Sequence, residues 1–167
     1  MDLRSNIDID ESWYEKPRGI TERFSCGGVV CRVNQAGQIL IVLTHEKDNR
    51  YFVLPKGGKE TGELDLDTAS REVREEAGIN DLTMIADLGW LRRLSFNKQI
   101  WSNTHFFLFY TQQIMCSPTD QDHSNDPSWF ELEDDRPYFW PDQRRLIQDN
   151  RIQINKLLLA HHNKLKI

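Results

Sequence analysis

Apolar residues along the chain fall into short stretches separated by turn-forming residues, and most of these stretches have the length of a strand. Residues 38–44 contain the continuous apolar run Ile39–Leu43, which is typical of a buried strand. Further segments rich in apolar or alternating positions also predict strands: residues 24–33, 51–54, 82–94 and 105–112. Residues 34–37, Asn-Gln-Ala-Gly, predict the hairpin turn that follows the first strand.

Two segments instead show apolar positions three and four residues apart, the spacing of a helix. In residues 66–77 these positions are Leu66, Ala69, Val73 and Ala77. Gly78 follows this helix, where glycine commonly ends one. Residues 141–160 predict a second helix, which begins with Pro141. Because strands alternate with helices, we expect an α/β (α+β) fold with a mixed sheet.

The polar segments between these elements are expected to be irregular: residues 45–50, 55–58, 96–103 and 117–128. Residues 1–22 predict a loose arm, docked by Trp13 and Tyr14. The 167 residues suit one domain, so we predict a single domain over residues 1–167.

Composition narrows the class of protein. Hydrophobic residues make up 38% and charged residues 28%, which is ordinary for a globular protein, and no apolar run has the roughly 20 residues of a membrane helix. The net charge of -5 argues against a broad nucleic-acid-binding surface. Cys26, Cys31 and Cys116 form no Cys-x-x-Cys pair, so we expect reduced thiols, with the first two in the core. With no signal-peptide pattern visible, a cytoplasmic location is expected.

The charge is concentrated in residues 57–79, which hold seven acids and three bases and so account for -4 of the net -5. Glu72, Glu75 and Glu76 are spaced i, i+3 and i+4, so they share one helical face and repel one another. A divalent cation would remove that repulsion, and carboxylates suit Mg²⁺ or Mn²⁺. The alternative is a solvated acidic helix whose glutamates pair with Arg71 and Arg74.

The spacing of the whole segment favours the metal site. It reads Gly57-x5-Glu63-x7-Arg71-Glu72-Val73-x-Glu75-Glu76-x-Gly78-Ile79, and it resembles the Nudix box at all nine specified positions, over 23 of the 167 residues. The resemblance implies an α/β/α sandwich and a Mg²⁺-dependent hydrolase of a nucleoside diphosphate linked to another moiety.

The resemblance also implies roles for individual residues. Those matching the metal ligands are Glu72, Glu75, Glu76 and the backbone carbonyl of Lys56. Those matching the catalytic residues are Glu72, Glu75 and Arg71, while Gly57, Glu63 and Gly78 match structural or orienting positions. Water would attack one phosphorus, with Glu75 as the general base. Glu131 and His123 are alternative bases by position only.

The substrate is less defined. The Pro55-Lys56-Gly57 sequence resembles the segment before the box in dinucleoside polyphosphate and diphosphoinositol polyphosphate hydrolases. No proline lies between Pro55 and Pro118, which argues against the ADP-ribose class, and the SQPWPxS motif of NADH hydrolases is absent. Asn97 stands where dinucleoside polyphosphate enzymes often have a tyrosine. We therefore favour a dinucleoside polyphosphate, with a diphosphoinositol polyphosphate, an oxidised nucleoside triphosphate or an RNA 5′ end as alternatives.

Several side chains after the box are candidate substrate contacts. Lys56, Arg92, Arg93 and Lys98 offer cations to phosphates. Trp101, with Trp90 and Phe96, offers rings to a base, although packing in the core or at a rim is the alternative for each. His105 is expected at a strand edge, and Trp129 at a pocket mouth. A function of another class is a non-catalytic Nudix domain that senses a nucleotide, but such domains usually lose box glutamates, which this chain keeps.

Overall fold

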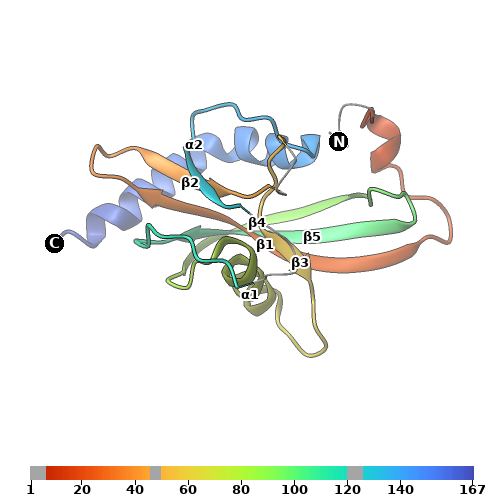
Figure 1. Cartoon of the computed structure of the whole chain (residues 1–167), viewed down its shortest axis with the longest axis horizontal. Coiled ribbons are helices and arrows are strands. Elements are labelled where there is room, and N and C mark those ends of the chain that lie inside the picture. The colour runs from red at the N-terminus through yellow and green to blue at the C-terminus, as the bar shows by residue number, and fades with distance from the viewer. Residues whose placement is uncertain (1–6, 46–49, 120–125) are drawn as a thin grey trace.

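A mixed β-sheet runs through the computed structural model, which describes residues 7–45, 50–119 and 126–167 (Figure 1). The sheet has the strand order β4-β5-β1-β2-β6, with β3 paired to β1 beside this path. Its strands are β1 (Thr21–Val33), β2 (Ile39–Leu43), β3 (Lys56–Gly58), β4 (Thr83–Leu94), β5 (Ile100–Tyr110) and β6 (Ser128–Glu131). The helices are the 3-10 turn η1 (Glu11–Tyr14), α1 (Asp65–Ala77) and α2 (Pro141–Lys164).

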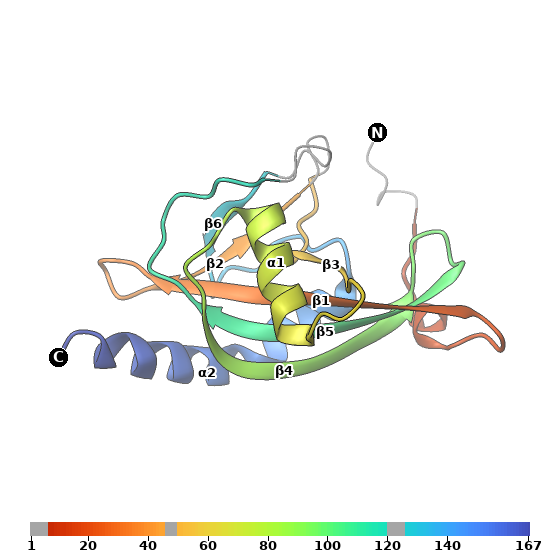
Figure 2. The same ribbon diagram turned by 90° about the horizontal axis from the view of Figure 1, so that it is seen from below.

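The two long helices cover opposite faces of the sheet, as the two views show (Figures 1 and 2). Successive side chains of a strand point to opposite faces, and β1 follows this rule. Val29 belongs to the core that includes Ile154 and Leu158 of α2, whereas Val30 belongs to the core that includes Val73 of α1. The expected α/β/α sandwich is confirmed.

Strand β1 organises the sheet because both of its edges are used. One edge pairs in parallel with β5, from Thr21↔Ile100 to Cys31↔Tyr110. The other edge is divided between two antiparallel partners: β3 lies beside Ser25–Gly27, and β2 beside Cys31–Val33. The segment that leads into α1 is therefore attached to the middle of the sheet.

The strands differ from the predicted ones in four places. Residues 51–54 form isolated bridges rather than a strand, and the Lys-Gly-Gly predicted as a break forms β3. Strand β5 begins at Ile100, inside the segment 96–103 predicted as a connection, and β6 was not predicted at all. In each case pairing with a neighbouring strand decides the conformation, and local sequence does not encode that pairing.

The N-terminal arm is docked, as predicted. Trp13 of η1 is 3% exposed, and its indole N–H donates to the carbonyl of Asp8 at 3.1 Å. Its ring centroid lies 6.0 Å from that of Trp140, just before α2. The arm is shorter than expected, because β1 begins at Thr21.

Two expectations from composition concern the described residues. Cys26 and Cys31 are buried in the core, as predicted, and Cys116 is also a free thiol. Among the helices in the described part of the chain, none combines the length and the apolar character needed to cross a membrane.

Candidate active site

Helix α1 carries the acidic segment and lies with its apolar side on the sheet. Ala69, Val73 and Ala77 are fully buried against β1 and β5, which fixes the position of the helix. Gly78 ends the helix in a left-handed conformation, with φ of 67°, and its N–H donates to the carbonyl of Arg74 at 3.0 Å. A Cβ at Gly78 would overlap the backbone of Ser117, so glycine is required there for two reasons.

Arg71 is the centre of the ionic network on α1. Its Nε and Nη2 donate to the two carboxylate oxygens of Glu63, each at 2.9 Å, and Nη2 also donates to the carbonyl of Gly58 at 2.9 Å. Its Nη1 donates to Glu72 at 2.8 Å and to both oxygens of Glu75 at 3.2 and 3.3 Å. This guanidinium ties the loop before α1 to the helix and neutralises part of the charge of the glutamates.

Two carboxylates of this network have shifted pKa values in opposite directions. The paired hydrogen bonds from Arg71 lower the pKa of Glu63 to about 2. Burial raises the pKa of Glu72, which is 8% exposed, although Arg71 opposes the shift. The Glu72 carboxylate rests against Gly57, where a Cβ would overlap it. Glycine at position 57 therefore makes the room that a buried Glu72 occupies.

The register of β3 aims the backbone of Lys56 at α1. In an antiparallel pair of strands, every second residue directs its amide and carbonyl toward the partner strand. The bonds of Gly28 to Pro55 and of Lys59 to Phe24 show that Pro55, Gly57 and Lys59 face β1 in this way. Lys56 therefore directs its amide and carbonyl away from β1. The Lys56 amide donates to the carboxylate of Glu76 at 3.0 Å. The Lys56 carbonyl faces the same side as its amide, toward the glutamates.

This arrangement fits a divalent cation by its donor chemistry. It offers the carboxylates of Glu72, Glu75 and Glu76 and a backbone carbonyl, which are hard oxygen donors, around the recess left by Gly57. Within the described ranges no three acidic, histidine or cysteine side chains already converge as a metal cluster, since Arg71 lies between Glu72 and Glu75.

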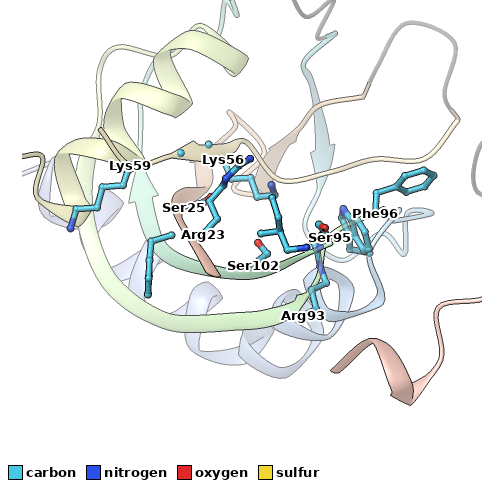
Figure 3. A pocket seen from close by; sticks show the side chains of 13 residues that line it. Arg23, Ser25, Lys56, Lys59, Arg93, Ser95, Phe96 and Ser102 are labelled. Carbon is cyan, nitrogen blue, oxygen red and sulfur yellow. Dashed lines mark hydrogen bonds between the residues drawn. The ribbon is translucent and has the colours of Figure 1, made fainter. Parts of the chain in front are cut away.

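A cavity of about 540 Å³ lies beside β3, all three residues of which line it (Figure 3). Lys56 joins the two regions: its backbone bonds Glu76, while its side chain lines the cavity. The other cationic side chains lining it come from three elements or loops: Arg23, Lys59 and Arg93. Burial, and next the nearby guanidinium of Arg93, lower the pKa of Lys56.

Arg93 forms a rigid part of the cavity wall. Its side chain is 7% exposed, its guanidinium carbon lies 3.3 Å from the ring centroid of Trp140, and its Nε lies 3.3 Å from the carboxylate of Asp142. Burial lowers the pKa of Arg93, and the Asp142 carboxylate opposes this shift. Three elements therefore hold this cation at the cavity: β4, the start of α2 and the aromatic cluster beneath the arm.

Comparison with known proteins agrees with this geometry. The family model described as NUDIX domain matches residues 25–149, which include the glutamates of α1, the cavity-lining Arg93 and most of the sheet. The chain belongs to the NUDIX domain family. The prediction of an enzyme of the Nudix pyrophosphohydrolase class is confirmed at this level. A search of curated protein sequences finds no match.

Solved Nudix structures share the fold. An Ap4A hydrolase of C. elegans, solved as a binary complex, superposes with a TM-score of 0.64 at 21% identity, over 80% of this chain and 98% of that one. The NUDIX domain of Shewanella oneidensis NrtR, complexed with ADP ribose, has a TM-score of 0.65 at 19% identity, over 87% and 99%. A MutT NUDIX hydrolase of Burkholderia pseudomallei has a TM-score of 0.58 at 19% identity, over 77% of this chain and 97% of that one. At these identities the likeness concerns the fold.

The Nudix site brings together only part of the predicted substrate contacts. Lys56 and Arg93 line the cavity, whereas Arg92 donates to Asn103 at 3.1 Å on the other face of β4. Lys98 lies over the ring of Trp13, 4.6 Å from its centroid, and Trp101 is buried in the same aromatic cluster. Arg92, Lys98 and Trp101 thus make contacts within the protein, and none of the three lines this cavity.

Trp90 follows the packing alternative, whereas the prediction for His105 is wrong. Trp90 stacks on His105 with ring centroids 4.5 Å apart, so this face of its ring is occupied. His105 is not at a strand edge: it lies on β5 between β4 and β1, and its two ring nitrogens are 2.8 Å from Asp65 and from Asp87. This contact attaches the first residue of α1 to the sheet.

Glu131 and His123 are the alternative candidates for the general base. The strand registers place Glu131 far from Lys56. Glu131 lies beside Leu40 of β2, which lies beside Arg32 of β1. Lys56 lies beside Gly27, five residues away from Arg32 along β1. That separation is about 16 Å along the strand, so Glu131 does not reach the Nudix glutamates. His123 lies outside the described residues. Trp129 donates to the carbonyl of Ile114 at 2.8 Å and does not line this cavity.

Sequence reasoning missed Arg23, Lys59 and three serines of the cavity: Ser25, Ser95 and Ser102. One signal was present, because Arg23 and Ser25 are two residues apart in a strand and so share one face. That they face Arg93 could be found only from the pairing of β1 with β5 and of β5 with β4.

Proposed function

We propose that this chain hydrolyses a diphosphate linkage with the help of Mg²⁺ or Mn²⁺, and that its favoured substrate is a dinucleoside polyphosphate. The observation that carries the proposal is the complete set of Nudix carboxylates on one face of α1, held by Arg71 beside the backbone of β3. The residues that would hold the cation are Glu72, Glu75, Glu76 and the carbonyl of Lys56.

A bound cation supplies Lewis acidity, which neutralises diphosphate charge and makes a water molecule more acidic. Glu75 is the proposed general base: its side chain is 37% exposed, and its bonds to Arg71 are the longest in that network. The water oxygen bonds to phosphorus as its proton passes to the carboxylate, and the bridging P–O bond breaks. Arg71 keeps Glu72 and Glu75 oriented during this exchange, because both accept from its Nη1.

The substrate part of the proposal rests on two lines of support. The Pro55-Lys56-Gly57 segment resembles that of dinucleoside polyphosphate hydrolases, and one structure of similar fold is an Ap4A hydrolase. Another was solved with ADP ribose, so that compound belongs in any test. A nucleotide-sensing role is the alternative of another class, and the intact box disfavours it. The three free thiols suit the proposed cytoplasmic setting.

The test is a hydrolysis screen with Mg²⁺, with Mn²⁺ and with chelator. The panel contains diadenosine polyphosphates, nucleoside triphosphates, ADP-ribose and a diphosphoinositol phosphate, with products separated by chromatography. We expect Glu76→Gln to lower kcat by about a hundredfold or more, because it removes a charged metal ligand. Asp67→Asn is the matched control, since Asp67 is an exposed acid of the same helix. Chelator-resistant hydrolysis, or full activity of Glu76→Gln, would refute the proposal.

A further inference from the structure

The cavity beside β3 is a concentration of positive charge. Every ionisable side chain among the described residues that line it is a cation: Arg23, Lys56, Lys59 and Arg93. Ser25, Ser95 and Ser102 add hydroxyl groups to the same wall (Figure 3). A wall of cations and hydroxyls is complementary to an anion with several oxygens.

Two of these cations keep N–H groups from which no described residue accepts a hydrogen bond. The Lys56 ammonium is partly buried and makes no hydrogen bond with the described residues. Arg93 is buried: its Nη1 donates to the carbonyl of Leu94 at 3.2 Å and its Nε is ion-paired with Asp142 at 3.3 Å. Its Nη2 has no hydrogen-bond partner among the described residues. Burial of a charged group is less costly when its N–H groups are hydrogen-bonded. An anion bound in the cavity would accept hydrogen bonds from the Lys56 ammonium and from Nη2 of Arg93.

Arg23 extends the positive wall to the surface. It is exposed on β1, and its guanidinium has no hydrogen bond or ion pair with the residues that the structure describes. Lys59, by contrast, is already paired with Asp65 at 2.7 Å. Arg23 is therefore the surface cation of the cavity that is available to a ligand.

The aromatic residues of the cavity do not form a slot for a base. Arg93 covers the face of Trp140, while Phe24 contacts Trp90 and Phe96 contacts Phe139. Phe24 and Phe96 are 50% and 43% exposed, at the rim. The interior is thus suited to phosphate, and the rim to an apolar or aromatic part of a ligand.

We infer that this cavity binds a phosphate group beyond the diphosphate that is cleaved, with Arg23, Lys56 and Arg93 as its specificity-determining residues. The inference rests on the proposed function, because it places the cleaved diphosphate at the carboxylates of α1. Lys56 lies at the junction: its backbone bonds Glu76 and its side chain enters the cavity. A substrate that spans this junction needs at least one additional phosphate.

The decisive comparison uses two substrates with the same bases, diadenosine diphosphate and diadenosine tetraphosphate. We expect kcat/KM to favour the tetraphosphate by about tenfold or more, the scale of a charge-assisted hydrogen bond. Arg23→Gln should remove most of that preference, whereas Arg18→Gln, an exposed arginine outside the cavity, should keep it. Equal kcat/KM for the two substrates in the wild type, or an unchanged preference in Arg23→Gln, would overturn the inference.

A binding experiment separates this inference from the proposed function. Inorganic tripolyphosphate is titrated calorimetrically into the protein in chelator, where no hydrolysis is expected. Arg23→Gln should raise its Kd by about tenfold. Arg93→Lys, which keeps the charge but loses the planar fork, should also raise it, once thermal unfolding shows that this variant is folded. If binding depends on Arg23 but no substrate is hydrolysed, the proposed function fails alone. If hydrolysis occurs but binding ignores Arg23, the inference fails alone.

The additional phosphate can come from a linear chain or from a phosphorylated ring. A diphosphoinositol polyphosphate therefore runs beside diadenosine tetraphosphate. Arg23-dependent hydrolysis of either one identifies the source and supports the inference. Dependence on Arg23 for neither, with both hydrolysed, overturns it.

Discussion

Arg71 and Glu63 form a bidentate ion pair in which both donor–acceptor distances are 2.9 Å. The pair spans the loop between β3 and the helix: Glu63 lies before α1, while Arg71 lies in its second turn. The same guanidinium also reaches Glu72 and Glu75. The Arg71–Glu63 pair therefore helps to position the proposed metal ligands Glu72 and Glu75, although neither Arg71 nor Glu63 is a proposed ligand.

This pair makes stability depend on pH in one direction. The pKa of Glu63 is lowered from 4.5 to about 2 by the folded structure, chiefly through its bonds with Arg71. Its stabilisation is fully present above pH 4.5 and is lost as the pH falls toward 2. In urea unfolding, wild type should exceed Glu63→Gln in stability at pH 7, and the difference should shrink between pH 4.5 and 2. Glu15→Gln, at an exposed position, is the control. A difference that does not change with pH would contradict the assignment.

Gly57 should be intolerant of the smallest side chain. A Cβ there would overlap the Glu72 carboxylate, whereas a Cβ at the adjacent Gly58 would meet open space. We expect Gly57→Ala to lower the free energy of unfolding by about 1–3 kcal/mol, a typical cost of overpacking. Gly58→Ala should stay within about 0.5 kcal/mol of wild type. Equal stabilities of the two variants in urea unfolding would contradict this account of Glu72.

His105 should couple energetically to the carboxylates on either side of it. Its ring nitrogens lie 2.8 Å from Asp65 at the start of α1 and 2.8 Å from Asp87 on β4. We expect His105→Ala to cost about 2–4 kcal/mol, from lost charge-assisted bonds and packing. A double-mutant cycle with Asp87→Ala should give a coupling energy of about 0.5–3 kcal/mol. Strict additivity would mean that the contact contributes nothing.

Trp13 should link the arm to the cavity. It is buried against Trp140, and Trp140 in turn supports Arg93. Trp13→Ala should lower stability by about 3–5 kcal/mol, a cost typical of a buried aromatic residue. Ile152→Ala, at a position that is 87% exposed, should have little effect. Because Arg93 would lose its support, Trp13→Ala should also weaken tripolyphosphate binding, measured calorimetrically. An unchanged Kd would show that Arg93 is positioned independently of the arm.

The sequence was sufficient for the box, because its residues are local. Helix α1 begins at Asp65 and ends at Ala77, within one residue of the predicted range, since periodicity and a terminal glycine both mark it. The bonds between Arg71 and Glu75 also follow from the i, i+4 spacing.

The cavity and the short strands were beyond prediction because they depend on distant pairing. The three residues of β3 have no sequence pattern typical of a strand, and they form one only by pairing with β1. Arg23 and Arg93 line the same cavity because both pair with Ser102 of β5, which lies between their strands. The positions of Trp101 and Lys98 depend on distant contacts for the same reason: Trp101 packs in a cluster with Trp13, and Lys98 lies over the ring of Trp13.

The most direct test of the central claim is hydrolysis of diadenosine tetraphosphate in ¹⁸O-labelled water with Mg²⁺, followed by mass spectrometry of the products. The account predicts that label enters a phosphate of one nucleotide product, and that Glu76→Gln, while remaining folded, slows the reaction by about a hundredfold or more. Persistence of labelled product in Glu76→Gln, at the wild-type rate, would contradict the claim that the carboxylates of α1 carry the chemistry.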